Sequence, residues 1–247
     1  MITREELGRS VRNIGVRQGD SLLVHSSMHA LGPIEAGADG VIDTLIDVVT
    51  PDGLIVVPTH TWDVVNKRQP VWHQTLTPSH VGVLTNRLRM RKEAIRSIHP
   101  THSVAAIGSR AREFCEAHEG DDSPCSPTSP YGRLIENKGK VLLLGVDLTR
   151  CTLIHCLEEM AGLGEIWSLT PPEPRFCILA NGEMISVLAR AHQNYKSANY
   201  DRVESALIKE GILNRMNIGR SQMRILDAAA LADYLVPRFR NDPHYFW

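Results

Sequence analysis

The stretch SLLVHSSMHALGPIEAGADGVIDTLIDVVTPDGLIVVP (21–58) decides the predicted fold. Its first segment, SLLVH (21–25), is a short apolar run, which is typical of a strand buried on both faces. DGVIDTLIDVV (39–49) places apolar residues at the three-and-four spacing of a helix with one buried face. After a Pro-Asp-Gly turn, LIVVP (54–58) is a second strand. This order predicts a βαβ unit, and such units bind ligands beyond the carboxyl ends of their parallel strands.

Similar patterns continue on both sides of this unit. Thr3 and Glu6 have the spacing of a capping box, so a helix is expected to begin there and to end near Gly15. VLLLGV (141–146) is the most strand-like segment, and we expect it in the sheet centre, with the residues after it at the ligand edge. Further helices are expected at 81–91 and 111–118, and a further strand at 104–107.

The last third of the chain differs from the rest. RFCILA (175–180) and EMISVLAR (183–190) flank Asn181-Gly182, and Asn-Gly favours the type I′ turn of a hairpin. This hairpin is expected to extend the sheet with antiparallel strands. DAAALADYLV (227–236) predicts a terminal helix with Asp227 as its cap. The expected fold class is α/β, a single domain over residues 1–247 with a mixed parallel and antiparallel central sheet flanked by helices.

Composition limits the classes of partner. A net charge of −1 and an aromatic content of 5% argue against nucleic acid. No apolar stretch approaches the roughly 20 residues of a membrane span, and the charged N-terminus does not resemble a signal peptide. Five cysteines without a C-x-x-C pair fit reduced thiols. We therefore expect a soluble, cytoplasmic protein that binds a small molecule, with no nucleic acid and no membrane as partner.

Two loops that follow or precede predicted strands carry polar side chains. In 24–40, Ser26 and Ser27 precede a helix, and their hydroxyls and nearby N–H groups could bind a phosphate. The alternative is an ordinary βα loop, because neither the Walker pattern nor the dinucleotide fingerprint is present. In RSIHPTHSVAAIG (96–108), Arg96 could contact phosphate while His99 fixes the loop by hydrogen bonding. The alternative is a surface loop stiffened by proline.

Two later segments also carry chemical groups. In GDDSPCSPTSPYGRL (120–134), Asp121 and Asp122 could attract a cation, or the segment is a solvated loop. In CTLIHCLEEM (151–160), His155 and Glu158 are three residues apart and therefore neighbours on a helix. A carboxylate in that position can hold an imidazole in one tautomer, as in a general-base dyad. The alternative is an ordinary surface pair.

Together these segments resemble the aminoglycoside 3-N-acetyltransferase family. VHSSMHALG, GLIVVPTHTW, RSIHPTHSVAAIG, SPYGRL and VLLLGVDLTRCTLIHCLEE occur in the family's order and spacing, over about residues 3–236. The most specific elements are HP-x-x-S at 99–103 and T-x-x-H-x-x-E at 152–158. Two departures are the segment DDSPCSP, where the family often has an aromatic-glycine segment, and Cys156-Leu157 between the histidine and the glutamate.

The resemblance implies an acyltransferase that uses acetyl-CoA as co-substrate and needs no metal. It implies that His155 is the general base toward a primary amine and that Glu158 orients it. We expect a hydroxyl or N–H near Thr152 to stabilise the oxyanion. The expected coenzyme contacts are Ser26, Ser27, Arg96, His99 and Ser103.

The resemblance also suggests an acceptor. It favours the 3-amino group of an aminoglycoside, in a ternary complex, with Asp63, Asp121 and Asp122 among the acids that could bind the polycation. Another primary amine in a biosynthetic reaction is the alternative.

Other interpretations of the function, and of two segments of the chain, stay open at this point. A metal-dependent hydrolase is suggested by 11 histidines, although no H-E-x-x-H motif is present. A cysteine or serine hydrolase and a non-catalytic coenzyme A-binding protein are further alternatives. HQNYKSANYD (192–201) either closes over the coenzyme or is a polar connection. PHYFW (243–247) either docks on the domain or forms a homodimer contact.

Overall fold

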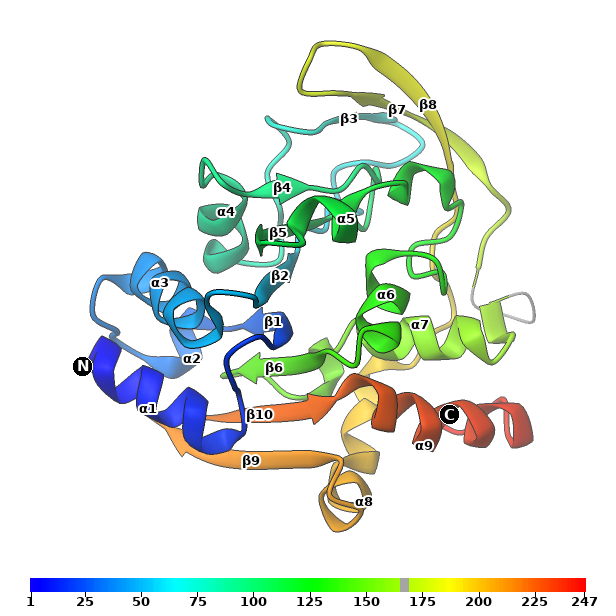
Figure 1. Ribbon diagram of the computed structural model, residues 1–247. Helices are drawn as coiled ribbons and strands as arrows, with labels where there is room; N and C mark the ends of the chain where they lie inside the picture. The colour runs from blue at the N-terminus through cyan, green and yellow to red at the C-terminus, as the bar shows by residue number, and fades with distance from the viewer. Residues whose placement is uncertain (165–168) are drawn as a thin grey trace.

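A mixed sheet forms the centre of the computed structural model, which describes residues 1–164 and 169–247. Within these residues the sheet has seven strands in the order β4-β5-β2-β1-β6-β10-β9 (Figure 1). The strands β2, β1 and β6 are parallel, whereas β4, β5, β10 and β9 are joined by antiparallel pairing. Their bounds are β4 Ile95–Arg96, β5 Val104–Gly108, β2 Leu54–Pro58, β1 Ser21–Ser26, β6 Lys140–Leu144, β10 Ser221–Asp227 and β9 Leu213–Ile218.

Helices cover both faces of this sheet (Figure 1). Alternation along each strand separates two apolar cores, because successive side chains of a strand point to opposite faces. Leu22 and Val24 of β1 pack in one core and Leu23 in the other. The first core contains residues of α1 (Arg4–Ile14), α3 (Gly37–Val49) and α4 (Val83–Arg89). The second contains residues of α5 (Ala111–Cys115), α6 (Pro130–Glu136), α7 (Leu153–Met160) and α9 (Ala228–Asn241).

Several sequence predictions are confirmed at the helix ends. Thr3 accepts a hydrogen bond from the backbone N–H of Glu6, and the Glu6 side chain accepts one in return, so the capping box of α1 is present. Asp227 caps α9 by accepting from the N–H of Ala230 at 2.8 Å. The βαβ unit and the mixed sheet are also as expected. The segment 141–146 contributes to β6, which lies between β1 and β10, one strand away from the middle of the sheet.

The predicted position of the hairpin is wrong. Its strands, β7 (Glu173–Ile178) and β8 (Met184–Ala189), do pair with each other, but they join β3 (Val71–His73) in a separate three-stranded sheet. Burial alternates along β7, with Arg175 and Cys177 buried and their neighbours accessible, which fits a sheet that packs on one face only. The strands that extend the main sheet are β9 and β10, which were not predicted from the sequence.

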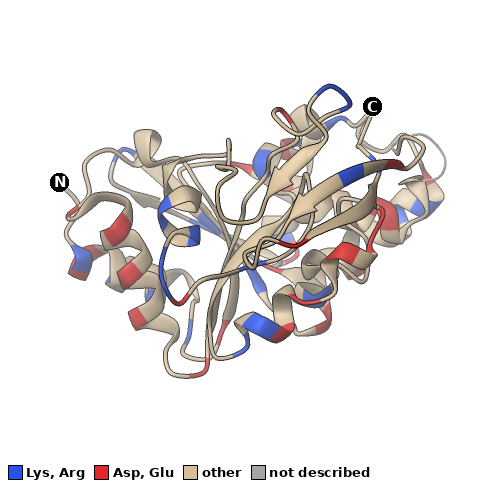
Figure 2. Cartoon of the chain, turned by 90° about the horizontal axis from the view of Figure 1, so that it is seen from above, with Lys and Arg blue, Asp and Glu red and all other residues tan. Residues whose placement is uncertain are grey.

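Charge is spread over the outside of the molecule. Figure 2 shows acidic and basic residues on helices at both sides of the sheet, in keeping with the net charge of −1. None of the helices in the described ranges has the length and apolar character needed to cross a bilayer. The cytoplasmic location and the single domain over residues 1–247 stay predictions.

Candidate active site

A cavity of about 1240 Å³ opens where the three parallel strands end. Its floor is formed by His25 and Ser26 at the end of β1, by Pro58 and His60 at and after β2, and by Gly145 after β6. The opposite wall includes residues of the small sheet and of the segment after β8. Ligand pockets of ~300–1,000 Å³ are typical for one drug-sized molecule. The cavity is larger than this range and lies at the edge where parallel strands place their ligands.

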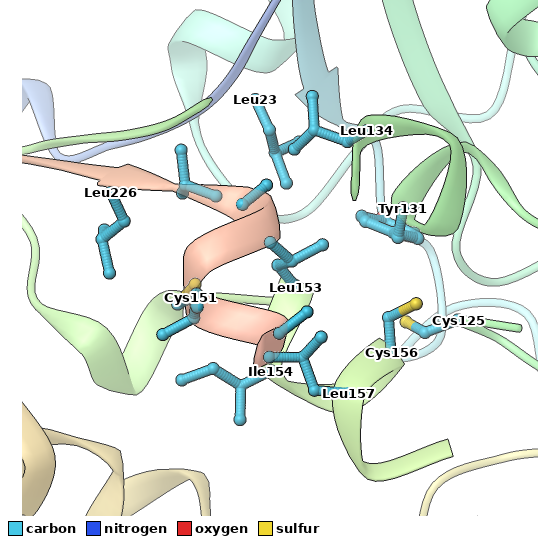
Figure 3. Packing of buried hydrophobic residues seen from close by; sticks show 14 of the residues in the cluster. Leu23, Cys125, Tyr131, Leu134, Cys151, Leu153, Ile154, Cys156, Leu157 and Leu226 are labelled. Carbon is cyan, nitrogen blue, oxygen red and sulfur yellow. The ribbon is translucent and has the colours of Figure 1, made fainter. Parts of the chain in front are cut away.

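The N-terminal half of α7 supplies the central side chain. A short 3-10 helix, η2 (Leu148–Arg150), leads from β6 into α7, and Asp147 caps it by accepting from the N–H of Thr149 at 3.1 Å. Leu153, Ile154 and Leu157 point into the core, as Figure 3 shows. His155 instead lines the cavity. The apolar spacing of CTLIHCLEEM thus fixes which way its histidine faces.

Glu158 holds the His155 ring in one orientation. Its Oε2 lies 2.9 Å from Nδ1 of His155, and the Glu158 side chain is only 3% exposed. The neutral imidazole therefore carries its proton on Nδ1 and donates it to the carboxylate, which leaves a lone pair on Nε2. In the described part of the chain no hydrogen bond uses Nε2, and this atom is not sealed from solvent. Nε2 is open to accept a proton.

Tyr200 supports the same ring, a role that was not predicted from the sequence. Its hydroxyl oxygen lies 3.0 Å from Nδ1 of His155. Burial, followed by the charge of Glu158, raises the pKa of Tyr200 well above its ordinary value, so the phenol stays protonated. The ring of Phe246 packs 4.8 Å from that of Tyr200, and Asn199 Nδ2 donates to the Phe246 carbonyl at 2.6 Å. The C-terminal aromatic segment thus docks on its own chain, while the homodimer stays a prediction.

Three more predicted site residues line the cavity. Thr152, Ser26 and Ser27 all border it. The Ser27 hydroxyl accepts from the N–H of Ala30 at 3.2 Å and caps α2 (Met28–Leu31), which leaves its own O–H group to donate. The Thr152 hydroxyl makes no hydrogen bond to any described residue and is not sealed from solvent. It is available to a ligand beside His155.

The three predicted coenzyme contacts of the HP-x-x-S region do not line the cavity. The Arg96 guanidinium lies over the Trp72 ring at 4.9 Å and donates to the carbonyl oxygens of Thr59 and Thr77. The hydroxyl groups of Ser103 and Thr59 form a hydrogen bond with their oxygen atoms 2.8 Å apart. His99 Nδ1 accepts from the N–H of His102 at 2.9 Å.

Burial decides the role of these groups. It lowers the pKa of His99 to about 3 and that of Arg96 to about 9. His99 is therefore a neutral acceptor inside the protein. The region supports the loop that brings Thr101 and His102 to the cavity wall.

None of the three predicted acidic substrate contacts lines the cavity itself. Asp63 Oδ1 is 2.7 Å from Nδ1 of His80, which lines the cavity. Asp122 pairs with Arg190 at 3.3 Å, and Arg190 lines it as well. Asp121 accepts from the Thr128 hydroxyl at 2.5 Å. The acids at the wall itself, among described residues, are Asp147 and Glu173, which were not selected from the sequence.

Histidines are unusually frequent in the cavity wall. His25 and His60 were not predicted, although His25 ends the apolar run SLLVH and His60 lies two residues after LIVVP, a signal that was present in the sequence. Burial lowers the pKa of His25 to about 3, and it lowers that of His60 well below its ordinary value. These rings are neutral near pH 7. The described histidines of the wall are His25, His29, His60, His80, His102, His155 and His192.

Comparison with known proteins agrees with this geometry. The family model described as aminoglycoside 3-N-acetyltransferase matches residues 23–240. The chain belongs to this family. An aminoglycoside N(3)-acetyltransferase IX of Micromonospora chalcea is 27% identical, with 95% of this chain and 92% of that protein covered. An aminoglycoside N(3)-acetyltransferase VII of Streptomyces paromomycinus is 33% identical, with 89% and 80% covered.

Solved structures of this acyltransferase family share the fold. The apoenzyme of aminoglycoside acetyltransferase AAC(3)-IVa has a TM-score of 0.81 and 26% identity, covering 99% of this chain and 91% of that one. AAC-IIIb, in a binary complex with CoASH, has a TM-score of 0.84 and 22% identity, covering 97% and 96%. The enzyme class and the mixed α/β fold expected from the sequence are confirmed.

The cysteines of this aminoglycoside 3-N-acetyltransferase family member do not form a nucleophilic site. Burial raises the pKa of Cys151 to about 12 and that of Cys156 well above its ordinary value, so both thiols stay protonated. Figure 3 shows Cys156 beside Cys125 among core residues. The cysteine-hydrolase alternative therefore lacks an activated thiolate.

One group of side chains in the described ranges has the spacing of metal ligands. Ligand atoms of Cys125, Glu159 and His192 lie within 4.8 Å of one another. However, Glu159 already accepts hydrogen bonds from His192, from the Cys125 N–H and from the Ser123 hydroxyl. Burial also raises the pKa of the Cys125 thiol well above its ordinary value, which opposes the thiolate that a metal needs. These residues fit a hydrogen-bonded cluster.

Proposed function

We propose that the chain, acting as one catalytic domain, transfers the acetyl group of acetyl-CoA to the 3-amino group of an aminoglycoside in a ternary complex. The observation that carries this proposal is the His155–Glu158 pair, whose open Nε2 is available at a cavity of about 1240 Å³. Family membership supports the reaction class. A related structure of AAC(3)-IVa, at 26% identity, is a complex with a gentamicin, which supports the class of acceptor.

His155 and Glu158 carry out the proton transfers of this reaction. His155 Nε2 takes the proton that the amine nitrogen loses as the new C–N bond forms. The imidazolium is stabilised by the buried Glu158 carboxylate, and it returns the proton to the coenzyme sulfur as the C–S bond breaks. The Thr152 hydroxyl is in place to donate to the carbonyl oxygen while that oxygen carries negative charge. A positioned base of this kind contributes about 10²–10⁴ in rate.

Acetyl-CoA fits the polar groups at one side of the cavity. Ser26 and Ser27 lie at the end of β1, and Arg150 lies at the end of η2 near His155. Arg150 forms no ion pair with a described residue, so its guanidinium can bind a phosphate bidentately. Arg150 was not selected from the sequence. We assign Ser26, Ser27 and Arg150 to the coenzyme and give Arg96, His99 and Ser103 a supporting role.

A second class of acceptor is favoured by the charge of the wall. Its described residues include four Lys or Arg side chains and two carboxylates, namely Lys67, Arg150, Arg175, Arg190, Asp147 and Glu173. A polycation gains less from such a wall than from an acidic one. An amine with fewer positive charges, as in a biosynthetic acetylation, is therefore the second candidate. Asp63 and Asp122, paired with His80 and Arg190, would have to be released to bind a polycation.

The proposal is tested by following release of the coenzyme thiol from acetyl-CoA with a panel of aminoglycosides and small primary amines. Transfer to aminoglycosides alone supports the first candidate, and transfer to monoamines at comparable kcat/KM supports the second. Mass spectrometry of the product identifies the acetylated nitrogen. If calorimetry detects acetyl-CoA binding and no amine is acetylated, the chain is a non-catalytic coenzyme A-binding protein and the proposal is wrong.

A further inference from the structure

A second histidine–carboxylate pair lies beside His155 and Glu158. Glu159 follows Glu158 on α7, and its Oε1 lies 2.8 Å from Nε2 of His192, in the segment after β8. The side chains of His192 and Glu159 are 5% and 6% exposed. The His192 ring stacks on the His155 ring, with centroids 4.6 Å apart and planes 27° apart. Adjacent carboxylates of one helix thus hold two stacked imidazoles at the same cavity.

Hydrogen bonding sets the tautomer of His192. The Glu159 carboxylate also accepts from the Cys125 N–H at 3.2 Å and from the Ser123 hydroxyl, so three donors fix its position. Because Nε2 of His192 donates to this carboxylate, the neutral ring carries its lone pair on Nδ1. Across residues 1–164 and 169–247 no hydrogen bond uses Nδ1, and the atom is not sealed from solvent.

The charge state of His192 agrees with a lone pair on Nδ1 that can accept a hydrogen bond. Burial lowers its pKa, the neighbouring His155 lowers it further, and Glu159 opposes both effects. The ring is therefore neutral near pH 7, and Nδ1 is a hydrogen-bond acceptor in the cavity wall. A neutral ring also leaves its stacked partner free to become imidazolium during the reaction, whereas two stacked imidazolium ions would repel each other.

A primary amine presents two N–H groups when its lone pair attacks the acetyl carbon. One proton goes to Nε2 of His155. We propose that Nδ1 of His192 accepts a hydrogen bond from the other N–H, which makes His192 a binding residue of the acceptor subsite. This inference rests on the proposed function and adds to it a residue that distinguishes primary from secondary amines. A secondary amine has one N–H only and leaves the His192 acceptor unpaired, so the site selects primary amines.

The experiment compares wild type, His192→Ala and His192→Phe with a primary amine acceptor from the panel and with its N-methyl analogue. Loss of one hydrogen bond predicts an increase of about 10-fold in the KM of the primary amine. The KM of acetyl-CoA should not change. The preference for the primary amine over its N-methyl analogue should fall by a similar factor in both variants. His192→Phe retains an aromatic ring for the stack on His155, so it separates hydrogen bonding from stacking.

Gln193→Ala is the matched control, because Gln193 is the exposed neighbour in the same segment. It should retain the wild-type KM values. Wild-type acceptor KM and unchanged primary-amine preference in both His192 variants would overturn the inference while leaving the proposed function intact. If the wild type acetylates no amine at all, the proposed function fails and this inference fails with it. Circular dichroism and acetyl-CoA affinity identify a variant that has not folded.

Discussion

His155 is held at one nitrogen by two oxygen atoms from different parts of the chain. Glu158 comes from the same turn of α7, at 2.9 Å, and Tyr200 comes from the 3-10 helix η4 (Ser197–Val203), at 3.0 Å. Both contacts leave Nε2 as the ring nitrogen available at the cavity. The orientation of the base therefore depends on the C-terminal third of the chain as well as on its own helix.

Replacing Tyr200 by Phe tests the second contact. The variant removes the hydroxyl beside Nδ1 and retains the ring that packs on Phe246. Because one buried hydrogen bond contributes about 1 kcal/mol, kcat should fall about 5-fold with the KM of acetyl-CoA unchanged. Steady-state kinetics checks this. Tyr195→Phe is the control, since the Tyr195 ring also contacts the His155 ring, with centroids 5.2 Å apart, whereas its hydroxyl forms no hydrogen bond with a described residue. Equal effects in both variants would contradict the role given to Tyr200.

For single residues, the contact within one helical turn was predicted from the sequence, whereas the contact between distant segments was not. The spacing of His155 and Glu158 is set by one helical turn, so the pair can be read from the sequence. Tyr200 is 45 residues from His155, and only the tertiary fold joins them. The residue types of Arg96, His99 and Ser103 suit a phosphate site. The sequence does not show that all three are buried, and their burial keeps them from lining the cavity.

The helix α6 links the cavity floor to the core. Tyr131 is its second residue, and its hydroxyl lies 3.0 Å from Nε2 of His60 in the cavity wall. The next residue is Gly132, and a Cβ there would lie 1.8 Å from the carbonyl oxygen of Pro127. Only a residue without a side chain lets α6 approach the preceding loop this closely.

Gly132→Ala should therefore destabilise the protein. Either α6 or the loop must move to relieve the clash, and overpacking of this kind costs about 1–3 kcal/mol. The free energy of unfolding from urea denaturation measures the effect. Gly120→Ala is the matched control, because nothing lies within 4 Å of a Cβ at Gly120, and a change there should stay within about 0.5 kcal/mol. Equal stabilities of the two variants would be inconsistent with the close approach.

Elements differ in how well the sequence predicts them. The apolar runs of β1, β2 and β6 and the periodic pattern of α3 were predicted, because fully buried strands and one-sided helices have clear signatures. The hairpin of β7 and β8 was also predicted, from its Asn-Gly turn. Its partner strand β3 is only three residues long, and in β9 and β10 polar and apolar residues do not alternate regularly. Strand partners are set by tertiary packing, which a local pattern does not contain.

Buried neutral histidines link the stability of the whole molecule to pH. Burial lowers the pKa of His25 and of His99 to about 3, from an ordinary value of 6.5. Between these two values the unfolded chain binds protons that the folded chain does not bind. Stability is therefore greatest above pH 6.5 and falls as the pH decreases toward 3, by about 1.4 kcal/mol per pH unit for each such histidine.

The histidine contribution can be isolated by substitution. His99→Asn removes one titrating group and retains an oxygen that can accept from the His102 N–H. The free energy of unfolding, measured in urea between pH 7 and pH 5, should depend less steeply on pH in this variant than in wild type. His29→Asn, at an exposed position, should retain the wild-type slope. If His99→Asn has the wild-type slope, His99 is not a neutral buried group.

The central claim is that His155 is the general base of acetyl transfer. The most direct test measures turnover of wild type and His155→Ala with the best amine of the panel, together with acetyl-CoA affinity by calorimetry. We predict that kcat falls by about 10²–10⁴ while acetyl-CoA affinity stays the same. Wild-type turnover in a folded His155→Ala variant would contradict the claim.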